Sequence, residues 1–150
     1  VVKSFQSALD LKIDVERGRT LFMKKCSICH RVGTEGKQVG PDIVSVQNKS
    51  AADLLLAILD PNREAQPNFN VYTVVTEAGR VFNGIIVAES ASSITLRRAE
   101  GKEDAIARAD IAQLVSTGKS MMPEGLEKDL SKQQIADAIA FIRSLGQKKK

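Results

Sequence analysis

The first clear helical pattern in the chain lies directly before its two cysteines. Asp14 suits the N-cap of a helix, because its side chain can accept a hydrogen bond from a backbone N–H of the first turn. Four of the next residues fall on one face at helical spacing: Val15, Gly18, Leu21 and Phe22. A glycine such as Gly18 weakens a helix unless another backbone must approach closely there. The pattern predicts a helix that ends at the cysteines and is crossed at Gly18 by a second helix.

The last part of the chain has the pattern of that crossing helix. Ser131 and Gln134 have the spacing of a capping box, in which the two residues exchange side-chain and backbone hydrogen bonds. An apolar stripe follows at Ile135, Ala138, Ile139 and Ile142. Gly146 is a natural end for the helix. We expect this helix to pack on the first one, so that the two ends of the chain meet.

A shorter helical segment lies between them. Ser50 and Asp53 have the composition of a helix start, and apolar residues continue the helical spacing to Leu59. The sequence Asp60-Pro61-Asn62 then ends the helix, because proline cannot donate a backbone hydrogen bond. The three helices together would surround a central gap.

From residue 71 to residue 115, β-branched residues and turn signals replace the helical period. Alternation predicts strands at residues 71–76, 81–88, 93–98 and 103–108, with turns at Glu77-Ala78-Gly79 and Glu100-Gly101. The inner face of this antiparallel sheet would carry Ile85, Val87, Ile94 and Leu96. We therefore expect a small β-rich insertion at about residues 70–115. It contains no Cys or His, so we expect it to act as a stabilising cover or a docking platform and not as a catalytic unit.

Length and charge set the wider organisation. The 150 residues suit one domain, which we place at residues 14–147, after an extended or loosely packed lead-in at residues 1–13. Residues 148–150 form a basic tail that accounts for much of the net charge of +4, so this charge does not indicate nucleic-acid binding. No apolar run approaches the roughly 18 residues of a membrane span. Because the chain starts at Val1 without a basic and apolar leader, we expect processing or excision from a longer protein.

The strongest candidate chemistry lies in five consecutive residues. Cys26 and Cys29 are the only cysteines, and His30 is the only histidine. The pattern Cys-x-x-Cys-His is typical of c-type haem attachment, in which the two thiols bond one porphyrin and the imidazole binds its iron. Aromatic residues make up only 4% of the chain, so a bound macrocycle could supply the large flat group that the core lacks.

Three other interpretations of the two cysteines are weaker. A thioredoxin-like motif needs a strand before it and a helix after it, whereas a helix precedes Cys26 and a loop follows Cys29. A structural zinc site needs four ligands, and the chain has three Cys and His residues in all. A disulfide over so short a loop would gain little stability.

Because His30 is the only histidine, a second histidine ligand from the same chain is excluded by counting. The sixth iron ligand is therefore a methionine, a weaker ligand or none. Met23 lies in the helix before the cysteines, too close to the His30 side of the porphyrin to reach its opposite face. Met121 and Met122 lie in a loop with Pro123, which could present a thioether to the opposite face. The alternative for both is a place in the core.

These motifs, in this order, resemble a class I cytochrome c. The shared features are Gly18 and Phe22, the Cys26–His30 run, Gly40-Pro41-Asp42-Ile43, Met122-Pro123 and Phe141 in the last helix. A closer resemblance, over about residues 15–145, is to the planctomycete-type haem-binding domain. The motifs that carry it are Gly40-Pro41-Asp42, Asp60-Pro61, Tyr72, Gly79-Arg80-Val81 and Ser120-Met121-Met122-Pro123-Glu124-Gly125.

The resemblance implies a mainly α fold, the class I cytochrome c fold, with an inserted small antiparallel β subdomain. It assigns the distal iron ligand to Met122, directly before the proline, and leaves Met121 in reserve. It also implies that the carbonyl of Pro41 accepts a hydrogen bond from Nδ1 of His30, which orients the ring. Domains of this family often form the end of larger proteins with dehydrogenase-like propellers.

The function implied is electron transfer rather than enzyme catalysis. One covalent haem c with histidine and methionine ligands would pass single electrons to or from a redox protein or a fused dehydrogenase domain. Thioether attachment implies a periplasmic or other extracytoplasmic location. The alternative is a haem-based sensor whose distal site is open or whose methionine is labile. A third hypothesis, that the β insertion is the binding module, lacks the stacking aromatic residues of a nucleic-acid surface.

Overall fold

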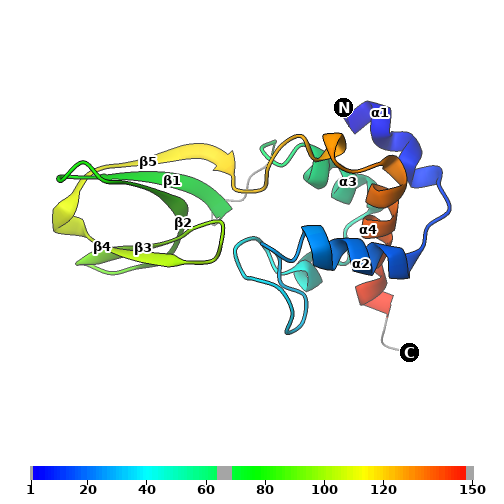
Figure 1. The fold of residues 1–150 in the computed structure, drawn as a ribbon, viewed down its shortest axis with the longest axis horizontal. Helices are drawn as coiled ribbons and strands as arrows, with labels where there is room; N and C mark the ends of the chain where they lie inside the picture. The colour runs from blue at the N-terminus through cyan, green and yellow to red at the C-terminus, as the bar shows by residue number, and fades with distance from the viewer. Residues whose placement is uncertain (1, 64–68, 148–150) are drawn as a thin grey trace.

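The computed structural model describes residues 2–63 and 69–147, and it places a group of helices beside a β-sheet (Figure 1). The helices are α1 (Val2–Phe5), α2 (Val15–Lys25), α3 (Ala51–Leu59) and α4 (Lys132–Ser144). Short 3-10 helices lie at Gln6–Asp10, Ile43–Val46, Arg108–Asp110, Leu126–Lys128 and Leu145–Gln147. The basic tail at residues 148–150 and the first residue of the lead-in lie outside the described residues.

Side-chain caps fix the starts of the three longer helices, as the sequence predicts. Asp14 accepts a hydrogen bond from the backbone N–H of Arg17 at 3.0 Å. Ser50 caps α3 by accepting from the N–H of Asp53. At α4 the full capping box is present, with Ser131 and Gln134 each accepting from the other's N–H (Ser131 Oγ at 3.1 Å, Gln134 Oε1 at 2.8 Å). The end of α4 differs, because the chain tightens into a 3-10 turn through Gly146 instead of ending there.

The predicted crossing of α2 and α4 is confirmed. A Cβ atom on Gly18 would lie 1.9 Å from the backbone oxygen of Asp137, so only glycine fits at this contact. Next to it the rings of Phe22 and Phe141 lie 5.4 Å apart at an angle of 50°. Both rings belong to the main hydrophobic cluster, which joins α2, α3 and α4. The two ends of the chain therefore meet in one core.

The expected extended lead-in at residues 1–13 is wrong for its described part. Residues 2–10 are helical, and Ala8 is fully buried. Phe5 packs against the helical core, and the ammonium group of Lys132 lies 5.7 Å above its ring. Helices this short have too few turns to show a periodic pattern, and contacts with α3 and α4 hold them.

The β-sheet has five antiparallel strands rather than the four that alternation predicts. They are β1 (Asn70–Thr76), β2 (Val81–Glu89), β3 (Ser93–Arg97), β4 (Glu103–Ala107) and β5 (Ile111–Ser120), in the order β4-β3-β2-β1-β5. The sheet thus extends to Ser120, beyond the expected boundary at residue 115. β5 has almost no buried position, so it shows no inward-facing alternation and is defined by its pairing with β1.

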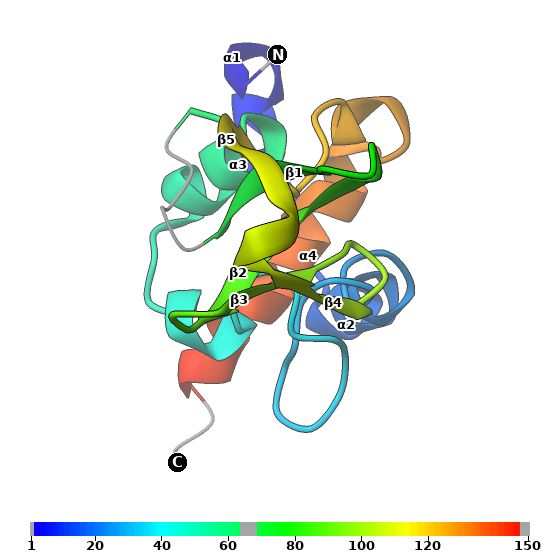
Figure 2. The same ribbon diagram turned by 90° about the vertical axis from the view of Figure 1, so that its left-hand side faces the viewer.

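The expected fold class, mainly α, is wrong. Among the described residues nearly as many lie in β-strands as in α-helices. Figure 2, seen from the sheet end, shows the strands as a layer of their own in front of the helices. The sheet also has its own buried cluster, made by Val74, Ile94, Leu96 and Ile106. The strands form through backbone pairing with residues far along the chain. Helical periodicity in the sequence does not detect such pairing, so it underestimates the share of residues in strands.

The predicted inner face of the sheet is also partly wrong. Ile94 and Leu96 are buried there, but Leu96 pairs with Ile86, whereas Ile85 pairs with Arg97. Residues that pair directly across two strands share a face, so Ile85 lies on the other one. The pairing shifts between Ile86 and Ala88, which leaves Val87 at a bulge. A bulge reverses the alternation, and periodicity alone does not reveal it.

The contact at Gly18 generates the first prediction. In Gly18→Ala the new Cβ would overlap the backbone of α4, so α2 and α4 must move apart. We expect a loss of about 3 kcal/mol in the free energy of unfolding, because overpacking at a backbone contact has little room to relax. Urea denaturation measures it. Lys24→Ala, at an exposed position of the same helix, is the control, and equal stability of the two variants would contradict the crossing.

Candidate functional site

The two cysteines and the histidine lie on one tight turn at the end of α2. The amide of Cys29 donates to the carbonyl of Cys26 at 3.1 Å, and the amide of His30 donates to the same carbonyl at 2.9 Å. Ser27 ties the turn to the helix, since its hydroxyl donates to the carbonyl of Met23 at 2.6 Å. The structure therefore brings the three residues together, and α2 fixes where they lie.

The chain after His30 folds back onto this turn. The amide of Lys37 donates to the carbonyl of Ser27 at 3.0 Å. The amides of Val39 and Gly40 both donate to the carbonyl of Cys29, at 2.9 and 2.7 Å. We call residues 37–41 the return loop. It lies directly against the turn that carries the cysteines.

The return loop holds the imidazole of His30 from two sides. Nδ1 of His30 lies 2.8 Å from the carbonyl oxygen of Pro41, the contact that the family resemblance implies. A Cβ on Gly40 would lie 2.7 Å from Cε1 of the ring, so the bare backbone of Gly40 packs against it. Burial lowers the pKa of His30, and the hydrogen bond to Pro41 partly opposes this. Because a carbonyl only accepts, Nδ1 carries the hydrogen and Nε2 keeps its lone pair for a metal ligand bond.

Both cysteines are free thiols and half-buried. Burial, together with the nearby Cys29, raises the pKa of Cys26 to about 11. Burial also raises the pKa of Cys29, which Lys37 partly opposes. Both thiols are therefore protonated at neutral pH. Two thiols and one imidazole with a free Nε2, all on one turn, fit a covalently attached haem whose iron the imidazole would bind.

The two candidate methionines lie in the loop between β5 and α4. Asn62, just after α3, accepts a hydrogen bond from the amide of Ser120 at 2.7 Å. The hydroxyl of Ser120 in turn accepts from the amide of Met122 at 3.1 Å. Both methionines are half-buried. The backbone of the loop is thus held by the end of α3, which also contributes to the helical core.

Met121, and not Met122, lines an open cavity of about 640 Å³ against the sheet. Its wall includes Phe82 of β2 and Ala99 of the turn between β3 and β4. The carbonyl of Ala99 lies 3.8 Å from Sγ of Cys29, so one rim of the cavity reaches the cysteine turn. Met23 instead packs against the helical core, as expected for a residue of α2.

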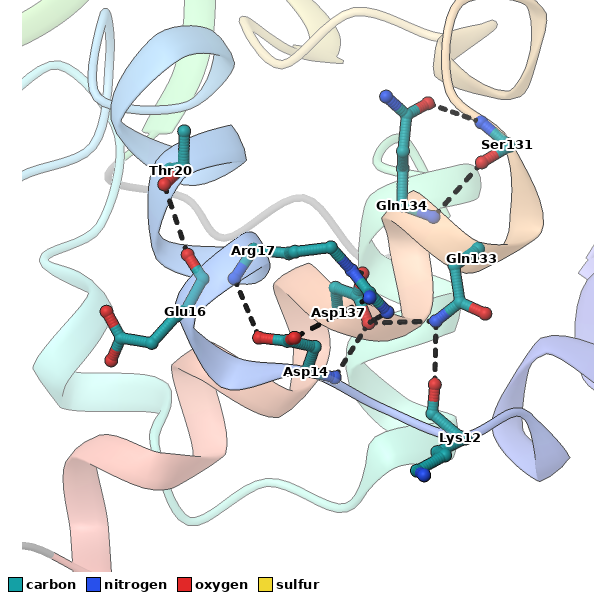
Figure 3. Close-up of polar contacts among 9 residues, drawn as sticks. All are labelled: Lys12, Asp14, Glu16, Arg17, Thr20, Ser131, Gln133, Gln134 and Asp137. Carbon is teal, nitrogen blue, oxygen red and sulfur yellow. Dashed lines mark hydrogen bonds and ion pairs between the residues drawn. The ribbon is translucent and has the colours of Figure 1, made fainter.

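Asp137, which the sequence patterns did not predict as a site residue, is only 3% exposed in the middle of α4 (Figure 3). Its carboxylate accepts from the amide of Asp14 at 2.9 Å, from Nε of Arg17 at 2.8 Å and from the side chain of Gln133 at 2.9 Å. Gln133 also donates to the backbone of Lys12. Asp137 thus anchors the N-terminus of α2, the helix that positions the cysteines. Its signal in the sequence is a carboxylate inside the apolar run 135–142.

Comparison with known proteins identifies a family. The sequence pattern of the family described as Cytochrome c matches residues 15–146, which include the sheet as well as the helices. A cytochrome c-553-like protein of Synechocystis sp. is 31% identical over 62 residues, which are 41% of this chain and 58% of that protein. The chain therefore spans little more than half the length of this relative. Among the described residues no helix is long and apolar enough to cross a membrane.

The second prediction concerns Asp137. Burial by itself raises the pKa of Asp137, but hydrogen bonds from Arg17, the amide of Asp14 and Gln133 outweigh it, so the pKa lies below its ordinary 3.8. The charged carboxylate therefore stabilises the fold at neutral pH, and this contribution is lost as the pH falls through the lowered pKa. We expect Asp137→Asn to lower the free energy of unfolding by about 2 kcal/mol at pH 7. The loss is no larger because Arg17, the charged partner, is exposed and solvent screens its charge.

The test is urea denaturation of both proteins at pH 7 and at a series of pH values below about 4. The difference between Asp137→Asn and the unchanged protein should shrink as the pH falls. Asp129→Asn removes an exposed carboxylate and serves as the control. A difference that stays constant down to the lowest pH would show that the charge of Asp137 does not contribute.

Proposed function

Since this chain belongs to the cytochrome c family and thus binds haem c covalently, we propose that it carries single electrons on an iron held by His30 and Met122. The observation that carries the proposal is the state of His30. Its Nδ1 is bound to the Pro41 carbonyl at 2.8 Å, which leaves Nε2 as the free donor. His30 is half-buried and follows directly after Cys29 on the turn that carries both free thiols.

In this proposal Cys26 and Cys29 hold the haem through thioether bonds, and His30 is the proximal ligand. The haem supplies a one-electron iron couple. The protein supplies the attachment, the ligand and a partly buried setting. The hydrogen bond to Pro41 fixes the tautomer of His30 and makes Nε2 a stronger donor. The close contact with Gly40 fixes the plane of the ring.

We assign the distal position to Met122. Its place directly before Pro123 matches the family motif, and the Asn62–Ser120 contacts hold its backbone. Met121 stays the reserve ligand, supported by its place on the cavity wall. A thioether is a soft ligand that favours ferrous iron and raises the potential. With both axial positions occupied, the protein would transfer electrons and not transform a substrate.

The subfamily, the cellular location, the redox partner and the domain bounds are also proposals. The motifs from Gly40-Pro41-Asp42 to Ser120–Gly125 favour the planctomycete-type haem-binding domain within the family. Thioether attachment favours the periplasm or another extracytoplasmic compartment. The partner would be a redox protein or a dehydrogenase domain of the same polypeptide. We keep residues 14–147 as the proposed cytochrome domain, with the sheet as its insertion.

The third prediction tests the attachment. A pyridine haemochrome spectrum of the purified protein should show a c-type haem that acidic acetone does not extract. The Cys26→Ser/Cys29→Ser double variant should lose the covalent haem, because a hydroxyl does not form the thioether. Ile28→Ala changes the exposed residue between the two cysteines and should keep it. Extractable haem in the unchanged protein would contradict the attachment.

The fourth prediction separates Met122 from Met121. Met122→Ala should lose the weak methionine–iron absorption band of the ferric protein, and its ferrous form should bind carbon monoxide rapidly. Met121→Ala should keep the band and exclude carbon monoxide. If only Met121→Ala loses the band, the distal ligand is Met121. Rapid carbon monoxide binding by the unchanged ferrous protein would favour a sensor with an open distal site.

A further inference from the structure

The turn between β3 and β4 lies against the return loop that holds His30. In Figure 1 the loop after α2 reaches toward this end of the sheet. Two contacts join the sheet to the return loop, one from Arg97 at the end of β3 and one from Lys37, and Ala99 of the same turn approaches Cys29. The sheet is therefore not separate from the candidate site, although it contributes no cysteine or histidine.

Arg97 makes the most constrained of these contacts. Its Nη1 donates to the carbonyl oxygen of Gln38 in the return loop at 2.5 Å. Its Nε and Nη2 donate to the carboxylate of Glu103 on β4, at 2.9 and 2.6 Å. The side chain is only 25% exposed. Because Nε and Nη2 both donate to Oε2 of Glu103, that edge of the planar guanidinium is held by β4, and Nη1 is directed at the return loop.

Lys37 makes the reciprocal contact from the return loop to the sheet. Its ammonium group donates to the carbonyl oxygen of Glu100 at 2.9 Å. A Cβ on Gly101 would lie 3.3 Å from Cδ of Lys37, so the lysine stem packs on the turn itself. Gly101 has a φ of +91°, which favours glycine and shapes the turn for this contact. Two consecutive loop residues, 37 and 38, are thus fixed by the sheet.

The next three residues carry this constraint to the imidazole. The amides of Val39 and Gly40 are bound to the carbonyl of Cys29. Gly40 packs against the His30 ring, and Pro41 accepts from Nδ1. Without the contacts at residues 37 and 38, only the backbone hydrogen bonds to the cysteine turn would hold Gly40 and Pro41 against the ring.

We propose that the sheet positions the axial histidine, with Arg97 and Lys37 as positioning residues that keep the Pro41 carbonyl on Nδ1 of His30. This inference rests on the proposed function, in which Nε2 of His30 binds the iron. The Pro41 hydrogen bond raises the basicity of the imidazole, and a more basic ligand stabilises ferric iron. Loosening the return loop therefore makes the ferric state less stable relative to the ferrous state, and this raises the midpoint potential.

The experiment compares Arg97→Gln and Lys37→Gln with Arg108→Gln in the haem-loaded protein. Arg108 makes the same kinds of contact, with the carboxylate of Glu89 and the carbonyl of Ser90, but entirely within the sheet. Two quantities are measured in each variant: amide hydrogen exchange at residues 39 and 40, and the midpoint potential by redox titration. Arg97→Lys, which keeps a charged donor, tests rescue.

We expect faster exchange at both amides and a higher midpoint potential in Arg97→Gln and Lys37→Gln, with partial recovery in Arg97→Lys. Arg108→Gln should change neither quantity in this way. The sign is informative, because simple loss of a cation near the haem would stabilise ferric iron and lower the potential. A raised midpoint potential therefore indicates a change in the His30 ligand and not the loss of a positive charge.

Two results would overturn the inference. Unchanged amide exchange in Arg97→Gln and Lys37→Gln would show that the sheet does not hold the loop. Faster exchange with an unchanged or lowered potential would show that the loop does not act on the iron. The absorption spectrum of the unchanged protein reports ligation by His30 separately. Failure of the proposed function would thus appear in the unchanged protein, and failure of this inference in the variants.

Discussion

The contact between the backbones of α2 and α4 at Gly18 sets the frame for the rest of the molecule. The absent side chain lets the helices approach until a Cβ would lie 1.9 Å from the carbonyl of Asp137. The same residue of α4 uses its carboxylate to bind the first turn of α2. The first and last of the longer helices are therefore held together, and the helical core is built around this crossing. The cysteine turn begins where α2 ends, so its place depends on the same contact.

The site itself depends on local hydrogen bonds around one imidazole. The amides of Val39 and Gly40 share the carbonyl of Cys29, and the next residue, Pro41, accepts from His30. This pairing fixes which ring nitrogen carries the hydrogen and which keeps a free lone pair. Burial raises the pKa of both thiols and lowers the pKa of His30, so all three side chains are held in their neutral forms near pH 7. The chemistry of the site thus follows from backbone geometry as much as from residue identity.

The sheet connects to this geometry through a few polar contacts and not through a shared apolar core. Its buried cluster is distinct from that of the helices. The contacts of Arg97 and Lys37 bridge the two parts at the return loop, and Ala99 approaches Cys29. In our proposal this polar bridge positions the return loop, while each part keeps its own buried cluster.

The caps at Asp14 and Ser131, the Gly18 crossing and the grouping of Cys26, Cys29 and His30 could be predicted from the residues alone, because each depends on neighbours a few residues away or on one apolar stripe. Features that depend on pairing between distant residues became visible only in the folded chain. β5 has no buried face, and the bulge at Val87 reverses the alternation, so periodicity found neither the fifth strand nor the correct inner face. The helical lead-in is held by α3 and α4. The contact of Arg97 with Gln38 joins residues 59 positions apart, and no local pattern encodes it.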